Sequence, residues 1–343
     1  MTEINPFNKL KIISHSDKIQ HLLNGKIPSP VRIVLEPTNL CNHNCIFCFY
    51  SNFRTDNKVY LSREKLFELA EDFKKLGVKS VSLVGGGEPM LHPAIYELIR
   101  WYHENSILIS ITTNGSTFRE SEIDTIVRAS TYIRVSLNAA SVQTHNAINA
   151  PNSSQFERII NNIDKLRRHR DKIGSNMLIG IKNAIFDKNI HEIEEMVALG
   201  ERLQVNYIMF ASVVGESPTA GQIIDIATEK IEKLNKKTSV LLFHSFYKKP
   251  RKTPKCISNP LIGTVSANGD MYLCGFMDHA DGRYKIGNIN ENRFIDLWGS
   301  KKHYEVYRSQ DPEYCAKYTC KMKEYDNVIR DVFIEDKMHI YSI

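Results

Sequence analysis

Apolar and polar residues alternate along most of the chain in blocks that predict a repeated strand-then-helix pattern. Short apolar runs rich in Val and Ile, typical of buried strands, lie at 31–36, 80–85, 107–115, 132–138, 177–186 and 205–211. Apolar residues at helical spacing predict amphipathic helices at 63–77, 93–105, 119–129, 153–170, 191–203 and 219–237. Ser62 is suited to cap the first helix, and Pro93 to begin the second. This alternation is typical of parallel βαβ units.

The number of units predicts the fold class. Six strand-and-helix units are too few for a closed eight-stranded barrel, so we expect an α/β fold with a partial (βα)6 TIM-like barrel. Its functional site should lie at the carboxyl ends of the strands. After about residue 240 the alternation stops, and short segments rich in Gly, Asn and Cys follow. We therefore expect an N-terminal extension at 1–30, the barrel at 31–240, and a small cysteine-rich domain with a C-terminal tail at 241–343.

The seven cysteines fall into an early and a late group. They are Cys41, Cys45 and Cys48, and then Cys256, Cys274, Cys315 and Cys320. No apolar run has the length of a signal peptide or a membrane span, so we expect a cytoplasmic protein without membrane contact. Because the cytosol keeps thiols reduced, clustered cysteines there indicate metal binding or catalysis rather than disulfides.

The early cysteines follow the first predicted strand with the spacing C-x3-C-x2-C. This spacing puts three thiolates in one tight loop. Three thiolates suit an iron–sulfur cluster and leave one iron of a four-iron cube open for a substrate or cofactor. A zinc site with His43 as the fourth ligand is the alternative, although zinc sites normally have a second Cys or His pair nearby.

With Phe47 before its last cysteine, this loop resembles the signature of the radical S-adenosylmethionine (SAM) superfamily. Residues that continue the resemblance follow the next three strands: Gly86, Gly87, Glu88 and Pro89, then Thr112–Gly115, then Ser136. The resemblance implies that SAM chelates the open iron of a [4Fe–4S] cluster through its amino and carboxylate groups. One-electron reduction then cleaves SAM to methionine and a 5′-deoxyadenosyl radical, which abstracts a substrate hydrogen. An electron donor such as flavodoxin or ferredoxin is the expected partner.

The candidate SAM-binding residues also have physical reasons to be there. Glycines let the backbone approach a ligand closely, and Glu88 offers an acceptor for the amino group of SAM. We therefore expect changes at Gly87 or Glu88 to weaken SAM binding and to leave the iron content near wild type. Asn114 and Ser136 suit hydrogen bonds to a ribose or a carboxylate, although both also fit plain turns. Lys182 faces into or out of the barrel according to a register that the sequence does not determine.

The late cysteines predict a second site. The segment IGTVSANGDMYLC at 262–274 predicts a hairpin with Asn-Gly at its turn, which would bring Cys256 and Cys274 together, and a helix-like stretch at 294–310 follows. This order resembles the twitch domain, a shortened SPASM auxiliary-cluster domain, and implies a second [4Fe–4S] cluster on all four late cysteines. The last pair, Cys315 and Cys320, departs from the family by its C-x4-C spacing, so a zinc ribbon or free buried cysteines stay alternatives.

Composition and charge exclude several classes of function. The chain is 42% hydrophobic and 24% charged, which excludes collagen-like, coiled-coil and disordered proteins. Its net charge of +6 is too small for a dedicated nucleic-acid binder, so no nucleic-acid partner is expected. The basic stretch at 247–255 predicts a solvated linker, with contact to an anionic substrate as the alternative.

The resemblance therefore implies a radical SAM oxidoreductase-type enzyme, acting by a dehydrogenation-type oxidation. Only about thirty residues precede the barrel, too few for the peptide-recognition domain of many maturases, which favours a small polar metabolite. A ribosomal peptide maturase is the alternative, although epimerisation is disfavoured if all seven cysteines are ligands and none donates hydrogen. A non-enzymatic binding protein stabilised by zinc is the alternative from another class of function. No residue is assigned as catalytic base or hydrogen donor.

Overall fold

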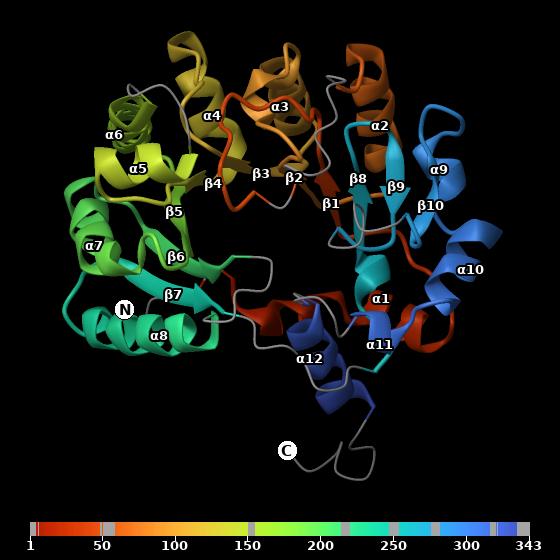
Figure 1. Ribbon diagram of the computed structural model, residues 1–343. Coiled ribbons are helices and arrows are strands. Elements are labelled where there is room, and N and C mark those ends of the chain that lie inside the picture. The colour runs from red at the N-terminus through yellow and green to blue at the C-terminus, as the bar shows by residue number, and fades with distance from the viewer. Residues whose placement is uncertain are drawn as a thin grey trace.

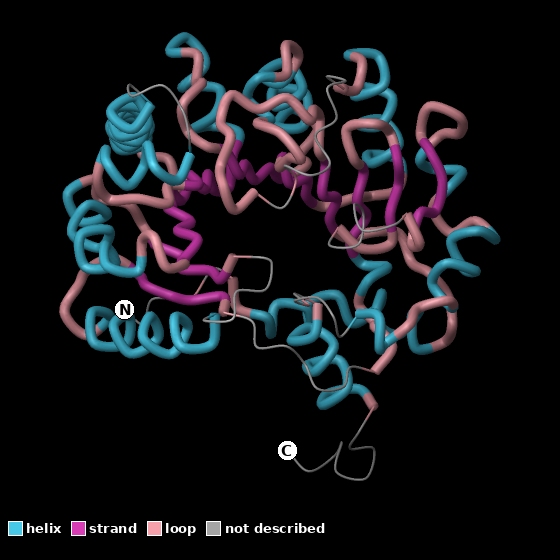
Figure 2. Tube along the Cα trace, in the orientation of Figure 1, coloured by secondary structure: helices cyan, strands magenta, loops and turns pink. Residues whose placement is uncertain are grey.

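One curved sheet organises the molecule. The computed structural model describes residues 5, 7–48, 50, 59–149, 155–213, 220–246, 254–275, 282–315, 320 and 322–334. In these residues ten strands form one sheet in the order β10-β9-β8-β1-β2-β3-β4-β5-β6-β7. The strands line the inside of an arc, and most of the helices cover its outside (Figure 1, Figure 2).

Seven parallel strands form the barrel part of the sheet. They are β1 Arg32–Leu35, β2 Ser80–Leu83, β3 Leu108–Thr113, β4 Ser130–Ser136, β5 Leu178–Ile185, β6 Tyr207–Ser212 and β7 Leu241–Ser245. Each pairs in parallel with the next along the chain. The α/β class and the partial barrel are thus confirmed. Strand β7 is one more than expected, because its apolar run at 240–243 falls where the sequence analysis places the end of the barrel.

The helices between the strands match the expected periodicity. They are α2 Arg63–Lys75, α3 Ile95–Glu104, α4 Ile123–Ala129, α5 Val142–Asn149, α6 Gln155–Ile173, α7 Ile193–Arg202 and α8 Ala220–Asn235. Short 3-10 turns lie at η3 Pro89–Leu91, η4 Glu120–Glu122 and η5 Ile190–Glu192. As predicted, Ser62 caps α2, its side chain accepting a bond from the Lys65 backbone N–H at 3.1 Å. Helix α5 was not predicted.

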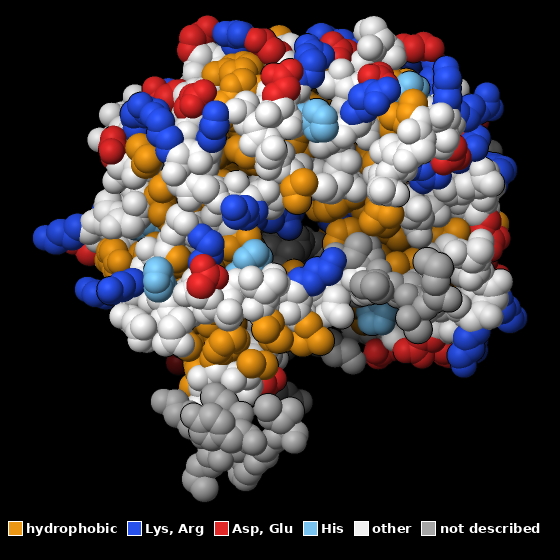
Figure 3. All heavy atoms as spheres, turned by 180° about the vertical axis from the view of Figure 1, so that it is seen from behind, with side chains coloured by type: hydrophobic (Ala, Val, Ile, Leu, Met, Phe, Trp, Pro, Cys, Tyr) orange, Lys and Arg blue, Asp and Glu red, His pale blue; other side chains and the backbone are white. Residues whose placement is uncertain are grey.

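Strand residues alternate between the helices and the inside of the arc. On β3, Ile109 and Ile111 are fully buried in the core shared with the helices, whereas Ser110 and Thr112 face the other way. Seen from behind, the molecule is hollowed near its centre, and Lys and Arg side chains lie beside the hollow (Figure 3). No described helix is long and apolar enough to cross a membrane.

The C-terminal segment joins the same sheet. Its elements are η6 Asn259–Leu261, β8 Ile262–Val265, β9 Asp270–Tyr272, β10 Lys285–Asn288, α9 Phe294–Leu297, α10 Lys301–Arg308, α11 Pro312–Cys315 and α12 Lys323–Phe333. The predicted hairpin is present as β8 and β9, and β8 also pairs in parallel with β1. The single helix expected at 294–310 is two helices, because Gly299 has a φ of +76° between them.

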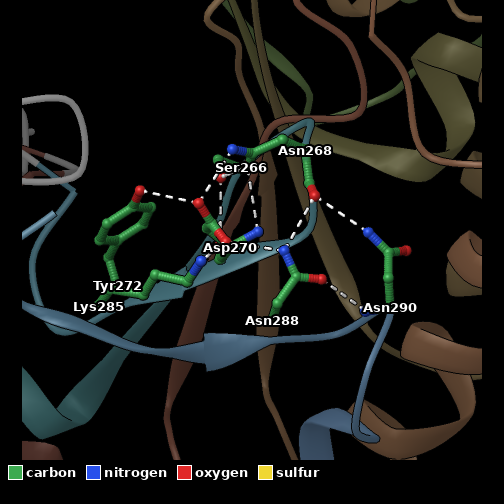
Figure 4. A network of polar contacts seen from close by, with 7 residues as sticks. All are labelled: Ser266, Asn268, Asp270, Tyr272, Lys285, Asn288 and Asn290. Atoms are coloured by element: carbon green, nitrogen blue, oxygen red, sulfur yellow. Dashed lines mark hydrogen bonds and ion pairs between the residues drawn. The ribbon is translucent and has the colours of Figure 1, made fainter.

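A polar network holds the β8–β9 hairpin (Figure 4). The buried Asp270 carboxylate accepts a bond from Asn288 Nδ2 at 2.7 Å and pairs with Lys285 Nζ at 2.5 Å. Gly269 at the turn has a φ of +87°, which favours glycine. Because the hairpin leads directly into Cys274, this network positions one of the late cysteines.

The N-terminal extension packs onto the C-terminal segment. It forms η1 Lys9–His15 and α1 Ser16–Leu23. Ile12, Ile19 and Leu22 share a small core with Leu261 and Ile329 of α12. Most of the basic stretch at 247–255 lies outside the described residues, so its predicted role as a linker stays a prediction.

Candidate active site

The early cysteine loop lies at the carboxyl end of β1, where the fold predicts a site. The last turn of α5 holds it: the backbone N–H groups of Asn44 and Ile46 donate to the carbonyls of Asn149 and Ile148 at 3.1 and 2.9 Å. Within the loop, Cys48 N donates to Cys45 O at 3.0 Å. A helix that the sequence did not reveal therefore shapes the loop.

The three early cysteines form a donor set that fits an iron–sulfur cluster. All three side chains are half-buried, and the backbone N–H of His43 donates to Cys41 Sγ at 3.5 Å. Such a bond stabilises thiolate sulfur, and three thiolates on one short loop leave the fourth iron of a cube open. The His43 ring, the expected zinc ligand of the alternative, is buried edge-on against His145 of α5, with 5.9 Å between ring centroids. Among the described residues, no three Cys, His, Asp or Glu side chains converge on a single-metal site.

The glycines after β2 lie directly against the chain that leads into the cysteine loop. Gly87 N donates to Thr38 O at 3.1 Å, and Glu88 N donates to Leu40 O at 2.6 Å. A Cβ on Gly87 would clash with the Leu40 carbonyl oxygen, whereas the nearest neighbours of one on Gly86 would be the Tyr50 ring at 3.3 Å and a Glu36 carboxylate oxygen at 3.5 Å. The absence of a side chain at Gly87 therefore permits this close approach.

Glu88 ties the ends of β2 and β3 together. Its buried carboxylate accepts bonds from Thr113 Oγ1 and Asn114 N, both at 2.6 Å, and from Met90 N at 3.1 Å. Burial raises the pKa of Glu88 to about 7, although the three bonds act in the opposite direction. The carboxylate thus has a structural task of its own, and its contact with the amino group of SAM stays a prediction.

Asn114 connects β3 to the cysteine loop. Its side-chain Nδ2 donates to Asn42 Oδ1 at 2.8 Å, and its Oδ1 accepts a bond from Ser116 Oγ at 2.8 Å. Asn42 Nδ2 closes the triangle on Ser116 Oγ at 2.8 Å. Because Asn42 lies between Cys41 and Cys45, Asn114 anchors the loop, and its predicted contact with SAM stays a prediction.

The remaining candidate SAM-binding residues lie around the same end of the barrel. Pro89 begins η3 and is buried beside Glu88. The Phe47 ring contacts the Phe186 ring just after β5, with 5.4 Å between centroids. Ser136 ends β4 and is half-buried. The structure thus places these residues at one edge of the sheet, and their contacts with SAM stay predictions.

A matched pair of glycine variants tests this packing. We expect Gly87→Ala to lower both SAM affinity and iron content, because overpacking against the Leu40 carbonyl costs about 1–3 kcal/mol and displaces the cysteine loop. This changes the expectation from the sequence that iron would be retained. Gly86→Ala should keep its iron, since its nearest neighbour is a side chain. Iron analysis and SAM binding are measured for both, and equal iron in both variants contradicts the loop contact.

The late cysteines lie at four places in the C-terminal segment, and Cys320 influences both Cys256 and Cys315. Cys256 precedes η6, Cys274 follows β9, Cys315 ends α11, and Cys320 precedes α12. Burial raises the pKa of Cys256 well above its usual value, and the nearby Asp326, Cys320 and Cys274 add to the shift. Burial also raises the pKa of Cys315, with Cys320 adding to it. These influences place the late cysteines near one another in pairs, and their ligation of a cluster by four thiolates stays a prediction.

Asp326 of α12 holds the Cys256 segment, a role that no local sequence pattern reveals. Its carboxylate accepts bonds from Ser258 N at 2.8 Å, Ser258 Oγ at 2.5 Å and Ile257 N at 3.0 Å. Cys256 Sγ lies 3.6 Å from the same carboxylate. Gln310 fixes the other side, because its Oε1 accepts a bond from Cys256 N at 3.0 Å.

We expect Asp326→Ala to lower the iron bound by the late cysteines. Each buried hydrogen bond to a charged group contributes about 1.5–3 kcal/mol, and the variant leaves Ser258 and Ile257 donors unsatisfied. Asp331→Ala on the same helix is the control, because Asp331 is exposed. Iron per chain is measured for both. If Asp326→Ala retains as much iron as Asp331→Ala, Asp326 does not position Cys256.

Two protein-family models match the chain, one over most of the barrel and one over most of the C-terminal segment. The model of the radical SAM superfamily matches residues 35–199, and SPASM, an iron–sulfur cluster-binding domain, matches residues 260–321. The chain is 22% identical over 331 residues to the AdoMet-dependent heme synthase of Methanosarcina barkeri, covering 88% of this chain and 90% of that protein. It is 28% identical over 186 residues to a probable GTP 3′,8-cyclase of Saccharolobus islandicus, covering 54% and 56%.

Solved structures share the fold. The structure of Streptococcus suis SuiB bound to S-adenosylmethionine aligns with a TM-score of 0.65 at 18% identity, covering 90% of this chain and 75% of that one. Native anSMEcpe with bound AdoMet aligns with a TM-score of 0.62 at 16% identity, covering 85% and 86%. At these identities the alignments concern the fold alone.

Proposed function

This chain belongs to the radical SAM superfamily and contains a SPASM iron–sulfur domain, and from this premise we propose that it oxidises a small polar substrate by dehydrogenation. Membership implies a [4Fe–4S] cluster with an open iron, SAM, and an auxiliary cluster. When bound, the first cluster supplies the electron that cleaves SAM to methionine and a 5′-deoxyadenosyl radical, the species that abstracts a substrate hydrogen. Flavodoxin or ferredoxin is the proposed electron donor.

The residues of this chain have distinct tasks in the proposal. Cys41, Cys45 and Cys48 hold the first cluster on the loop that α5 supports. Gly87 lets the β2 loop approach that segment. Around them, Phe47, Gly86, Glu88, Pro89, Asn114 and Ser136 are proposed to surround SAM. Because these residues follow β1 to β4 in turn, the bound SAM would lie across the carboxyl ends of those strands.

Support for oxidation comes from the SPASM match and from the proximity of Cys274 and Cys320 to Cys256, and of Cys320 to Cys315. A dehydrogenation removes two hydrogens: one leaves as a hydrogen atom to 5′-deoxyadenosyl, and the other as an electron and a proton. A cluster on four thiolates has no open iron for a substrate, and so supplies one-electron chemistry. We further infer that the domain is of the shortened twitch type, with one auxiliary cluster.

A peptide substrate is the second candidate. It is favoured by the fold of SuiB bound to the precursor peptide SuiA, which aligns over 90% of this chain with a TM-score of 0.66. A metabolite and a peptide are distinguished by trapping: 5′-deoxyadenosine formed with deuterated candidate substrates gains deuterium only from the true substrate.

Anaerobic reconstitution tests the proposed activity directly. Incubation with dithionite and SAM should yield 5′-deoxyadenosine and methionine in equal amounts, measured by liquid chromatography and mass spectrometry. Iron and sulfide should be present in the isolated protein. Zinc in place of iron, without SAM cleavage, would instead support the non-enzymatic binding protein.

A further inference from the structure

Lys182 faces the inside of the barrel. In the sheet it lies level with Ser136 on β4 and Met209 on β6. Its neighbours Ile179 and Ile181 are fully buried in the core shared with the helices, so the alternate residues Gly180 and Lys182 face inward. This register is the one that the sequence left undetermined.

Aromatic rings occupy the lumen on the amino-terminal side of Lys182. The Tyr207 ring lies over Gly180, where a Cβ would clash with it. Phe7, from the N-terminal extension, contacts the Tyr132 and Tyr207 rings at centroid distances of 5.3 and 5.1 Å. A ligand that reaches Lys182 is therefore held against these rings and toward the carboxyl ends of the strands.

Arg134 adds a second positive charge to this layer. Its Nε donates to Tyr207 Oη at 3.2 Å, and its guanidinium lies 4.9 Å from the Phe7 ring centroid and 5.2 Å from that of Tyr132. These contacts hold the guanidinium in place and leave its charge unneutralised. Because Arg134 is two residues before Ser136 on β4, it lies diagonally across from Lys182.

The two cations have no acidic partner in the described part of the chain. Among the described residues no ion pair involves Lys182 or Arg134, no hydrogen bond involves Lys182 Nζ, and Arg134 is the only charge that acts on Lys182. Burial lowers the pKa of Lys182 to about 8, and the charge of Arg134 acts in the same direction. Placing two like charges together in a poorly solvated space is unfavourable, and an anion bound between them would offset that cost. Lys and Arg side chains also lie beside the hollow on the back of the molecule (Figure 3).

We propose that Lys182 and Arg134 bind an anionic group of the substrate, a carboxylate or a phosphate, inside the barrel. The proposal rests on the proposed function and narrows its substrate to small molecules or peptides with such a group. The candidate SAM-binding residues Gly86 and Asn114 lie at the ends of β2 and β3, whereas Ser136, at the end of β4, pairs directly with Lys182 on β5. The carboxylate of SAM is the other anion with the right chemistry for this site. The first experiment distinguishes it from an anionic group of the substrate.

The first experiment measures SAM alone. We expect Lys182→Met to bind SAM within about twofold of wild type, and to form 5′-deoxyadenosine without substrate at a similar rate. Lys188→Met, at an exposed position after β5, is the control for loss of a lysine. A loss of SAM affinity of about tenfold in Lys182→Met alone would assign the cation to the SAM carboxylate and overturn the proposal.

The second experiment uses inorganic phosphate as the probe on the wild-type holoenzyme with SAM bound. Acetic anhydride acetylates neutral lysine amines, and peptide mass spectrometry gives the rate at each lysine. Phosphate or malonate should slow the acetylation of Lys182 several-fold and leave that of Lys188 unchanged. Equal rates at Lys182 with and without both anions would contradict the site. This measurement needs no variant and no SAM cleavage, so failure of the proposed function and failure of the anion site give different results.

Discussion

The Cys45→Ala variant is expected to form no 5′-deoxyadenosine. The change removes one of three thiolates, and a cube held by two protein thiolates is poorly retained. The hydrogen bond from Cys48 N to Cys45 at 3.0 Å should persist, because it uses the backbone carbonyl of Cys45. Iron should fall from about eight to about four per chain, since each cube carries about four. Iron analysis and the SAM cleavage assay measure both effects.

A variant in the same loop provides the control. Asn44 is exposed, and its contact with Asn149 uses its backbone N–H, so Asn44→Ala keeps the loop and all three thiolates. It should cleave SAM near the wild-type rate. If Cys45→Ala still formed 5′-deoxyadenosine, the assignment of this loop as the cluster-binding segment would be removed.

The sequence predicted those elements whose signal is local. Strand β3 alternates the buried Ile109 and Ile111 with Ser110 and Thr112, and α2 has both an apolar stripe and a capping Ser62. Helix α5 buries only His145, Ile148 and Asn149, so its sequence lacks an apolar stripe and the helix went unpredicted. The pairing of β8 with β1 was also missed, because no local pattern records which strands become neighbours.

The residues of the candidate site also differ in whether a local sequence pattern predicts their position. The cysteine spacing predicts one loop because all three residues lie within a few positions. The hydrogen-bond partners of Glu88 and Asn114 depend on how three loops pack, so the chemistry of these side chains is predictable from the sequence but their partners are not. Asp326 contacts Cys256 across 70 positions, a distance at which no spacing rule applies. The direction of Lys182 required the register of β5, which is fixed by its neighbours in the sheet.

The quadruple variant with alanine at Cys256, Cys274, Cys315 and Cys320 is expected to lose the oxidation and keep SAM cleavage. Iron should fall from about eight to about four per chain, because the early cysteine loop keeps its own cube. The barrel should stay folded, since β8 remains paired with β1 through the backbone and Val265 remains in the main core. Without the second cluster, a substrate radical has no nearby acceptor for its electron.

The comparison with Cys45→Ala makes this prediction specific. Both variants should hold about four irons, yet only the quadruple variant should form 5′-deoxyadenosine, so the same iron count would accompany opposite activities. Electron paramagnetic resonance of the reduced proteins identifies the remaining cluster, because only the one with an open iron changes its spectrum when SAM is added. An unchanged iron count in the quadruple variant, or zinc in that site of the wild-type protein, would eliminate the auxiliary cluster. Loss of the auxiliary cluster would also contradict the proposed dehydrogenation, since the substrate radical would then have to regain a hydrogen or rearrange.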